Sequence, residues 1–496
     1  MEEEGLPPTR PSWCLEDSDY CWTEEPPLVK KESLSVAAVC TPHSGHMLPL
    51  LRICSELAKR GHQVKVYTTD WAKAEFQPKI EKAGCEYAAL DMQGHDNESV
   101  EKLSEAKKQI GFIMLEELMI PPLRKACEQK RPDVVIADFA GTAGCQVAED
   151  LKISLVVNVP GPLSMVRAFC GIVDTSTAIN FLGLHIARQR LGTWELLRWT
   201  GIQKMSNWSA RFRSSLANGA LVLVQTIWGL DNTLPVYPNI VVTGPVLPPA
   251  ADLREKLAAE HPELSAFLRQ SQAVVYVTTG SLAKLHDWQV KVIYEGLKKA
   301  KCRVVWSLKE DLQKFLPEQN SDFLISKWTP QAELLQDEAV KVVITHCGWG
   351  GTLETLSAGK PIVAIPFFGD QPENAHLLKN AGVGELIGRI PKGTEGVKNP
   401  YKEGWMTADS VYQAVTKVLG SDSYRQAARK LQRASLASGG ATCAAEHVEW
   451  AAWYGTEHLK PANFSHATGS NPYNGVMVAT LALAATGLAL LYRLSK

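Results

Sequence analysis

The sequence predicts an α/β protein made of two Rossmann-like, doubly wound domains. Short apolar runs, such as Ser35 to Cys40 and Ala273 to Thr278, have the length of strands buried in a parallel sheet. After each run come a turn that contains glycine and then helical segments, in the β-α-β order of a doubly wound domain. The chain has 496 residues, a length that favours two domains with tails over a single core.

The first domain is predicted over residues 33–246. Its expected elements are a strand at 35–40, a helix at 47–60, and strands at 62–69, 133–137, 220–225 and 240–242. Residues 160–216 carry apolar side chains without clear strand signals, so we expect helices and loops that cover an acceptor-binding cleft. A proline-rich segment follows, and we expect residues 247–265 to link the two domains.

The second domain is predicted over residues 266–456. Its expected elements are strands at 273–278, 303–308 and 342–345, and helices at 412–419, 425–437 and 442–453. Residues 1–32 contain nine acidic side chains and five prolines without hydrophobic periodicity, which predicts a disordered acidic tail.

Charge and cysteine content exclude some classes of function and compartment. The 52 basic and 53 acidic residues give a net charge of −1, and no basic stripe interleaved with aromatic residues is present, so nucleic acid is not expected as a ligand. The eleven cysteines include no C-x-x-C pair, and no apolar run in the first thirty residues resembles a signal peptide. These features favour free thiols in a reducing compartment.

The C-terminal region contains a possible membrane segment. Residues 475–492 form an uncharged run of eighteen positions, near the minimum that crosses a bilayer, and residues 457–474 form a polar juxtamembrane linker. The alternative is a buried or interfacial helix, since Ala, Gly and Thr make the run only moderately apolar. We expect a tail-anchored protein, with both domains in the cytosol at the surface of the endoplasmic reticulum or another organelle.

One segment of the second half has the features of an anion site. A strand ends at Thr345, the glycine-rich turn His346-Cys347-Gly348-Trp349-Gly350-Gly351 follows, and a helix begins near Thr352. Such a turn presents free backbone N–H groups and the positive end of a helix dipole to a phosphate. His346 adds a hydrogen-bond donor, and Glu354 lies one turn into the helix, where its carboxylate can accept hydrogen bonds from hydroxyl groups of a ligand.

The segment from Trp328 to Gln371 resembles the donor-binding signature of the family 1 UDP-glycosyltransferases, and its length of 44 residues is the same. The resemblance extends from about residue 34 to 455. It implies a GT-B fold, in which two Rossmann-like domains face a central cleft, and a UDP-sugar as co-substrate. The implied donor-binding residues are Ser281, Trp328, Thr329, Gln331, His346, Gly348, Trp349, Gly350, Gly351, Thr352, Glu354, Asp370 and Gln371.

The resemblance also assigns roles to these residues. It implies that Trp328 stacks on uracil, that His346 contacts the diphosphate, and that Asp370 and Gln371 bind sugar hydroxyls. The plant members usually have Asn and Ser after the tryptophan, whereas this chain has Gly350 and Gly351. Two side-chain contacts are therefore missing, and we expect backbone N–H groups or Thr352 to replace them.

The catalytic pair is also implied by the resemblance. The Gly45-His46 pair matches the family motif whose histidine is the general base, and Asp138 matches its supporting aspartate. Because a helix dipole disfavours a cation at the N-terminus, we expect His46 to stay neutral near pH 7. His43 has no glycine before it and is expected to be a loop residue.

The combined prediction is an inverting, metal-independent hexosyltransferase. His46 and Asp138 would activate a hydroxyl of a small apolar acceptor, and the second domain would hold a UDP-sugar, with glucose suggested by Trp349 and Gln371. No cofactor, metal ion or nucleic acid is expected to take part. Two alternatives stay open: a non-catalytic, membrane-tethered module that binds UDP-sugar, and a UDP-sugar epimerase on the same fold.

Overall fold

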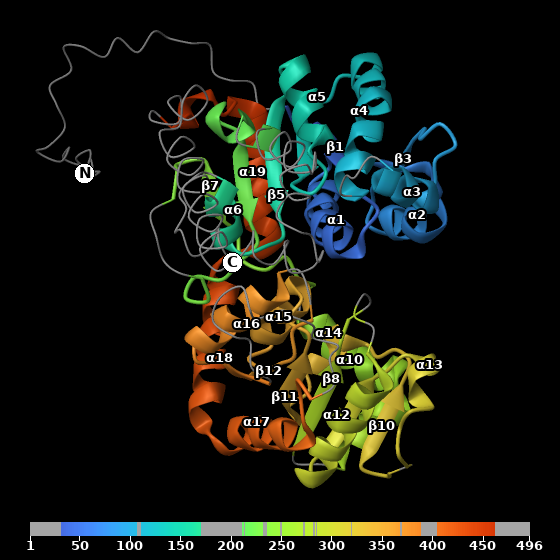
Figure 1. Ribbon diagram of the computed structural model, residues 1–496. Helices are drawn as coiled ribbons and strands as arrows, with labels where there is room; N and C mark the ends of the chain where they lie inside the picture. Colours follow the sequence, from blue (N-terminus) through green and yellow to red (C-terminus); the bar gives the residue numbers. More distant parts are fainter. Residues whose placement is uncertain are drawn as a thin grey trace, which may run out of the picture.

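The computed structural model of the chain contains two parallel β-sheets, each in its own domain (Figure 1). It describes residues 31–106, 111–169, 211–212, 214–231, 236–248, 250–270, 273–280, 283, 285–318, 320–367, 370–387 and 404–461. Buried helices and strands alternate along both domains. The predicted pair of doubly wound α/β domains is thereby confirmed.

The first sheet has seven parallel strands, and its connections reverse direction between two central strands, β1 and β4. In spatial order the strands are β3 (Glu86–Leu90), β2 (Gln63–Thr69), β1 (Ser35–Val39), β4 (Val134–Asp138), β5 (Ser154–Val159), β6 (Leu221–Val224) and β7 (Ile240–Val242). In open α/β sheets, ligands bind beyond the carboxyl ends of the strands at such a reversal. The end of β1 next to β4 is therefore the place to look for a site.

Helices cover both faces of this sheet. On one face lie α1 (Ser44–Lys59), η1 (Asp70–Ala72) and α2 (Lys73–Lys82). On the other lie α3 (Asn97–Ala106), α4 (Gly111–Gln129), α5 (Ala143–Leu151) and α6 (Leu163–Phe169). A Cβ on Gly144 would lie 2.8 Å from the Cβ of Ala137 and 3.1 Å from that of Val39. The bare glycine thus lets α5 approach β1 and β4 closely.

The second sheet has six parallel strands and reverses between β8 and β11. In spatial order they are β10 (Phe323–Ser326), β9 (Arg303–Ser307), β8 (Val274–Thr278), β11 (Val340–Thr345), β12 (Ile362–Ala364) and β13 (Gly384–Leu386). One face is covered by α12 (Asp287–Lys299) and α17 (Ala408–Gly420). The other carries α10 (Ala250–Glu260), α11 (Pro262–Arg269), α14 (Gln331–Leu335), α15 (Trp349–Ser357), α16 (Gln371–Asn380) and α18 (Asp422–Ala437). The short helix α13 (Glu310–Gln313) follows β9.

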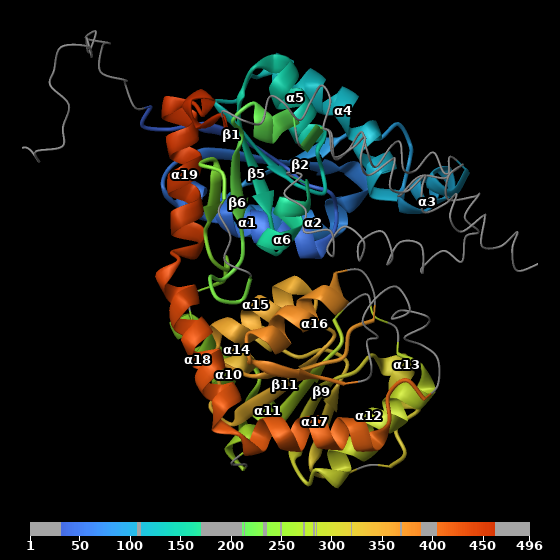
Figure 2. The ribbon, with the colours of Figure 1, turned by 60° about the vertical axis from the view of Figure 1, so that its left-hand side comes forward.

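The last helices return the chain to the first domain (Figure 2). Helix α18 packs in the second domain, whereas α19 (Gly440–Tyr454) packs on α1 and is followed by η3 (Glu457–Leu459). Glu449 of α19 lies 2.9 Å from Nη1 of Arg60 and 2.9 Å from Nε2 of His62. The small side chains of α19 fit against the first sheet, so this helix belongs to the first domain.

The domain limits thus differ from those predicted from the sequence at two places. Residues 440–454 were expected in the second domain, within 266–456, but they pack on the first. Residues 250–260 were expected in a linker, within 247–265, but they form α10, whose Leu257 is buried in the core of the second domain. Local periodicity predicts a helix without showing which domain its apolar face will contact.

Several predicted features lie outside the described residues. These are most of the acidic tail, most of the segment 160–216, Ser281, and the apolar run 475–492. Among the helices that the structure does describe, none has the length and apolar character needed to cross a bilayer.

Candidate active site

The first part of the site lies at the carboxyl ends of β1 and β4. His46 is in the first turn of α1, just after β1, and Asp138 is the last residue of β4. Since the two strands are paired and parallel, their ends meet, and Nδ1 of His46 lies 2.8 Å from Oδ1 of Asp138. Asp138 is fully buried, whereas 29% of the His46 side chain is exposed. The structure thus brings the predicted base and its predicted partner together.

The protonation of His46 follows from these contacts. Burial lowers its pKa, but the charge and hydrogen bond of Asp138, together with the charge of Asp370, raise it more, so the pKa lies above its ordinary value. The helix-dipole argument, which predicts a neutral histidine, leaves out this buried carboxylate. Because a carboxylate only accepts hydrogen bonds, the neutral ring carries its proton on Nδ1 and keeps a lone pair on Nε2. His43 is the exposed N-cap residue of α1, and its side chain makes no capping hydrogen bond.

Two buried amides behind Asp138 were not singled out from the sequence. Nδ2 of Asn158, in β5, donates to Oδ2 of Asp138 at 3.2 Å, and Nε2 of Gln225, just after β6, donates to Oδ1 of Asn158 at 2.7 Å. The backbone N–H of Ala140 donates to Oδ1 of Asp138 at 3.0 Å. The sequence does contain one sign of this contact, because Asn158 interrupts the apolar run Leu155 to Val159. A polar side chain in a buried strand needs a hydrogen-bond partner.

The second part of the site lies at the corresponding edge of the second sheet. His346 directly follows β11, and Gly280 follows β8. A Cβ on Gly280 would lie 2.6 Å from Cε1 of His346, and one on Gly348 would lie 2.5 Å from its Nε2. Two bare glycines therefore leave room for the imidazole ring. Burial lowers the pKa of His346 to about 4, so at neutral pH it is an uncharged donor.

Helix α15 begins directly after this histidine. Gly348 is its N-cap residue, and no side chain caps the helix. The first backbone N–H groups of a helix have no partner within the helix. Together with the helix dipole and the N–H of a neutral His346, they form a site that suits a diphosphate.

A row of hydrogen-bonding side chains leads away from α15. Trp328 is 63% exposed and offers an open ring face, whereas Thr329 is buried. The hydroxyl of Tyr276, in the middle of β8, lies 2.8 Å from Oγ1 of Thr329 and donates to Oε1 of Gln331 at 3.2 Å. Nε2 of Gln331 then donates to Oε2 of Glu354 at 2.6 Å. The row suits a flat base beside Trp328 and a ribose beside Glu354.

Tyr276 and Arg52 were also missed from the sequence. Burial raises the pKa of Tyr276 to about 12, so its hydroxyl stays protonated and can donate. Arg52, in α1 of the first domain, has Nη2 at 3.6 Å from Oε1 of Glu354, and its Nη1 donates to the carbonyl of Val246 at 2.8 Å. An arginine in a helix of the other domain gives no local sign of this contact.

The residues at the start of α15 show how the glycine pair affects the site. A Cβ on Gly350 would meet nothing within 4 Å, and one on Gly351 would meet only Nε2 of Gln331 at 3.6 Å. Thr352 is fully buried, and within the described residues its hydroxyl has no hydrogen-bond partner. The side chain of Thr352 therefore does not replace the missing Asn and Ser, and the backbone N–H groups remain for that role. The Trp349 side chain is only 5% exposed and packs between the domains.

The two predicted sugar-binding residues occupy different environments. Asp370 is exposed, accepts a hydrogen bond from Nδ2 of Asn374 at 2.7 Å, and acts electrostatically on His46. Gln371 is buried, and its Oε1 accepts the N–H of Phe367 at 2.9 Å. Asp370 thus faces the catalytic pair, while Gln371 shapes the loop before it.

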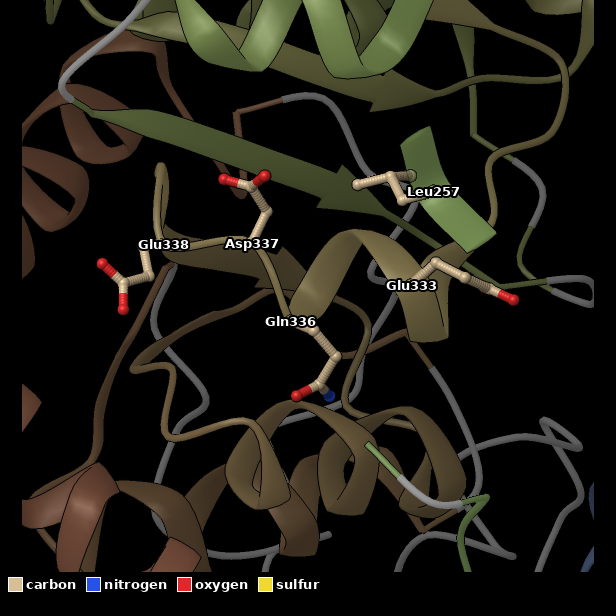
Figure 3. Close-up of a pocket in the computed structure, with 5 residues that line it drawn as sticks. All are labelled: Leu257, Glu333, Gln336, Asp337 and Glu338. Carbon is tan, nitrogen blue, oxygen red and sulfur yellow. The ribbon is translucent and has the colours of Figure 1, made fainter. Parts of the chain in front are cut away.

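A separate surface hollow of about 280 Å³ lies beside α10 and α14 (Figure 3). It is lined by Leu257, Glu333, Gln336, Asp337 and Glu338. Figure 3 shows the carboxylates of Glu333 and Glu338 pointing in different directions. Three acidic side chains would repel a diphosphate, and none of the predicted donor-binding residues lines the hollow.

Comparisons with known proteins agree with this site. The family model described as UDP-glucoronosyl and UDP-glucosyl transferase matches residues 203–435, a range that includes all the predicted donor-binding residues. UDP glycosyltransferase 9 of Catharanthus roseus is 21% identical over 457 residues, which cover 82% of this chain and 94% of that protein. The family model and such relatives support a family 1 UDP-glycosyltransferase.

The solved structures show the fold of this glycosyltransferase. A UDP-glucosyltransferase from Polygonum tinctorium aligns with a TM-score of 0.64 and 18% identity, covering 84% of this chain and 98% of that one. The GT-B arrangement expected from the sequence is thus confirmed. A UDP-glycosyltransferase of Talaromyces amestolkiae is 27% identical over 304 residues, and the match spans 52% of this chain and 56% of that protein.

Proposed function

We propose that the protein transfers a hexose, preferably glucose, from a UDP-sugar to a hydroxyl group of a small apolar acceptor, with inversion at the anomeric carbon. One observation carries this proposal: the His46–Asp138 pair lies opposite the nucleotide-binding half. The carboxylate of Asp370, beside the start of α16, raises the pKa of His46 electrostatically. A general base and a sugar-binding carboxylate on facing domains suit transfer between two bound substrates.

The proton transfer falls to Nε2 of His46. Asp138 accepts a hydrogen bond from the N–H at Nδ1, so the lone pair on Nε2 is free to take the proton of the acceptor hydroxyl. The acceptor oxygen then forms a bond to the anomeric carbon, while the bond from that carbon to the β-phosphate oxygen breaks. The electron pair leaves with UDP. A single displacement of this kind inverts the anomeric configuration.

The second domain stabilises the leaving group. The backbone N–H groups at the start of α15 and the N–H of neutral His346 are fixed donors for the charge that develops on the diphosphate. We expect the reaction to need no metal ion. In the described part of the chain, no group of three or more His, Cys, Asp or Glu side chains could hold one. Activity that is lost in EDTA and restored by Mg²⁺ or Mn²⁺ would contradict this part of the proposal.

Glucose is supported over a carboxylated sugar by the charge near the sugar site. Asp370 is an exposed carboxylate at the place where the sugar hydroxyls would bind, and it would repel the carboxylate of glucuronic acid. Transfer rates with UDP-glucose, UDP-galactose and UDP-glucuronic acid test this. A preference for UDP-glucuronic acid would overturn the choice of sugar and leave the reaction class unchanged.

The central experiment measures UDP release from UDP-glucose with and without a panel of phenol and sterol acceptors. Acceptor-dependent release, with one glycoside formed for each UDP, supports transfer. Binding of UDP-glucose without release would favour a non-catalytic module, and conversion into another UDP-hexose would favour an epimerase. The stereochemistry of the glycoside, read by NMR, tests inversion.

Membrane attachment through residues 475–492 and a cytosolic orientation are part of the same proposal. They rest on the uncharged apolar run in the sequence. Full-length protein should pellet with membranes, and protein truncated after Ser470 should not. Asn207 stands in the sequon Asn207-Trp208-Ser209, and N-glycans on it in the full-length protein would contradict the cytosolic orientation.

A further inference from the structure

A buried chain of hydrogen bonds connects the catalytic pair to the opposite domain. It runs from His46 through Asp138 to Asn158 and then to Gln225. Asp138, Asn158 and Gln225 are each at most 2% exposed. Buried polar groups are costly unless they are paired, so a chain of three paired groups in one sheet has a fixed arrangement.

The direction of each hydrogen bond in this chain is determined by chemistry. Asp138 as a carboxylate only accepts, so Asn158 must turn its Nδ2 toward it. The carbonyl oxygen Oδ1 of Asn158 then points the other way and accepts from Nε2 of Gln225 at 2.7 Å. Gln225 therefore prevents the Asn158 amide from flipping, and a flip would place an oxygen against the Asp138 carboxylate.

Gln225 also makes a contact with the second domain. Its backbone carbonyl accepts the indole N–H of Trp349 at 2.8 Å. Trp349 is the first residue of α15, whose N-terminus forms the anion site, and it packs with Ile227 and Leu230 of the first domain. The position of the donor-binding helix is thus connected, residue by residue, to the orientation of Asp138.

We propose that Asn158 and Gln225 are positioning residues that orient Asp138, and through it His46, and that the Trp349 contact aligns this base with the donor-binding helix. The inference rests on the proposed function, since it assigns His46 as the base of that reaction. Neither amide touches substrate in this account. Both act on the rate of the chemical step and not on the affinity for UDP.

The test compares three single variants and one double variant by steady-state kinetics. Asn158→Leu removes the donor to Asp138 and should lower kcat about tenfold to a hundredfold, which is the scale for a hydrogen bond to a charged group. Gln225→Met should lower kcat by a smaller factor. The double variant should be no slower than Asn158→Leu alone, because Gln225 acts through Asn158. Trp349→Phe removes the indole N–H together with part of the ring volume, and it should lower kcat about threefold or more, since one neutral hydrogen bond alone has that scale.

Two readouts separate positioning from a merely structural role. The dissociation constant for UDP, measured by calorimetry, should stay within about twofold of that of the wild type in Asn158→Leu and Gln225→Met. The acid limb of the kcat/KM profile should move to higher pH in Asn158→Leu. The lost N–H stabilises the Asp138 carboxylate, so the pair takes up a proton more readily without it.

Asn239→Leu is the matched control. Asn239 is also a fully buried amide in the first domain, but among the residues that the structure describes its Nδ2 donates to the carbonyls of Leu216 and Ala220, at 3.1 and 2.9 Å, and to no part of the catalytic pair. This variant should lower the melting temperature and leave kcat and its pH profile unchanged. If Asn158→Leu is insoluble, Gln225→Met and its pH profile decide the test.

The inference is overturned if Asn158→Leu and Asn239→Leu have the same kcat and the same pH profile in an active enzyme. It is also overturned if the effects of Asn158→Leu and Gln225→Met multiply in the double variant. Failure of the proposed function looks different, because the wild type itself would then show no acceptor-dependent release of UDP.

Discussion

Two histidines lie on opposite sides of the point of reversal in their respective sheets and have opposite electrostatic properties. His46 and His346 both follow a strand that borders the point where the sheet connections reverse, β1 in one sheet and β11 in the other. The pKa of His46 is raised, whereas burial lowers that of His346 to about 4. One is fitted to take a proton, and the other is fitted to donate a hydrogen bond without carrying charge.

The difference comes from the strand next to each histidine. In the first sheet the neighbouring strand β4 ends in a buried carboxylate, Asp138. In the second sheet the neighbouring strand β8 ends in Thr278 and leads to Gly280, which leaves space for the imidazole and supplies no charge. A histidine beside the point of reversal is thus a base or a neutral donor, depending on whether the adjacent strand supplies a carboxylate.

The largest effect is expected from His46→Ala. Loss of the general base should lower transfer by about 10² to 10⁴, while UDP binding stays intact because the nucleotide is held by the other domain. Product formation and calorimetry measure the two quantities separately. Transfer that survives within about tenfold would show that His46 is not the base.

The next largest effect is expected from His346→Gln, on the pH dependence of the free energy of unfolding. An imidazole with its pKa lowered in the folded state binds a proton mainly after unfolding, so the stability of the wild type should fall as the pH drops from about 6.5 to 4. The contribution of this one group is about 3 kcal/mol over that range. Urea unfolding across this pH range should show a smaller decline for His346→Gln.

A smaller effect is expected at the ribose site. Glu354→Ala should weaken UDP binding by about 1.5 to 3 kcal/mol, the scale for hydrogen bonds to a charged group, while binding of uracil barely changes. Arg52→Ala removes the partly exposed ion pair with Glu354 at 3.6 Å and the hydrogen bond to the carbonyl of Val246, and its effect on UDP binding should stay below about 1 kcal/mol. Calorimetry with UDP and with uracil measures both. An unchanged UDP affinity in Glu354→Ala would contradict the assignment of the ribose site.

The smallest effect is expected from Gly351→Ser, which should increase the affinity for UDP. The added side chain has room, because only Nε2 of Gln331 lies within 4 Å of its Cβ position. A hydroxyl at the start of α15 should tighten UDP binding by about 0.5 to 1.5 kcal/mol, the net value of one hydrogen bond. Gly420→Ser, at the exposed end of α17, is the control for a general effect of replacing glycine and should leave UDP binding unchanged. Weaker UDP binding in Gly351→Ser would show that the glycine is needed for close approach of the backbone.

Local sequence patterns predicted the secondary structure well near the catalytic pair. The run Ser35 to Cys40 became β1, and the helix expected at 47–60 became α1 with one more turn at its start. Apolar periodicity reflects burial along a single element, and it therefore also predicted the helices α17 and α18. It could not show that α19 returns to the first domain, since that depends on which surface its apolar face meets.

The site itself was predictable only where one segment holds several of its residues. The stretch from Trp328 to Gln371 carries most of the donor-binding residues, and the resemblance to a family motif could therefore reveal them. Arg52, Asn158 and Gln225 reach the site from separate elements and belong to no motif. Their importance arises from the packing of strands and domains, which a single sequence does not display.

The most direct test of the account is a pH titration of the two imidazole rings in one protein sample. Histidine labelled with ¹⁵N allows both rings to be followed by NMR, with His46→Ala and His346→Gln used to assign the signals. We expect His46 to titrate above the ordinary histidine value of about 6.5, and His346 to stay neutral down to about pH 4. Equal pKa values for the two rings, or a lower value for His46 than for His346, would contradict it.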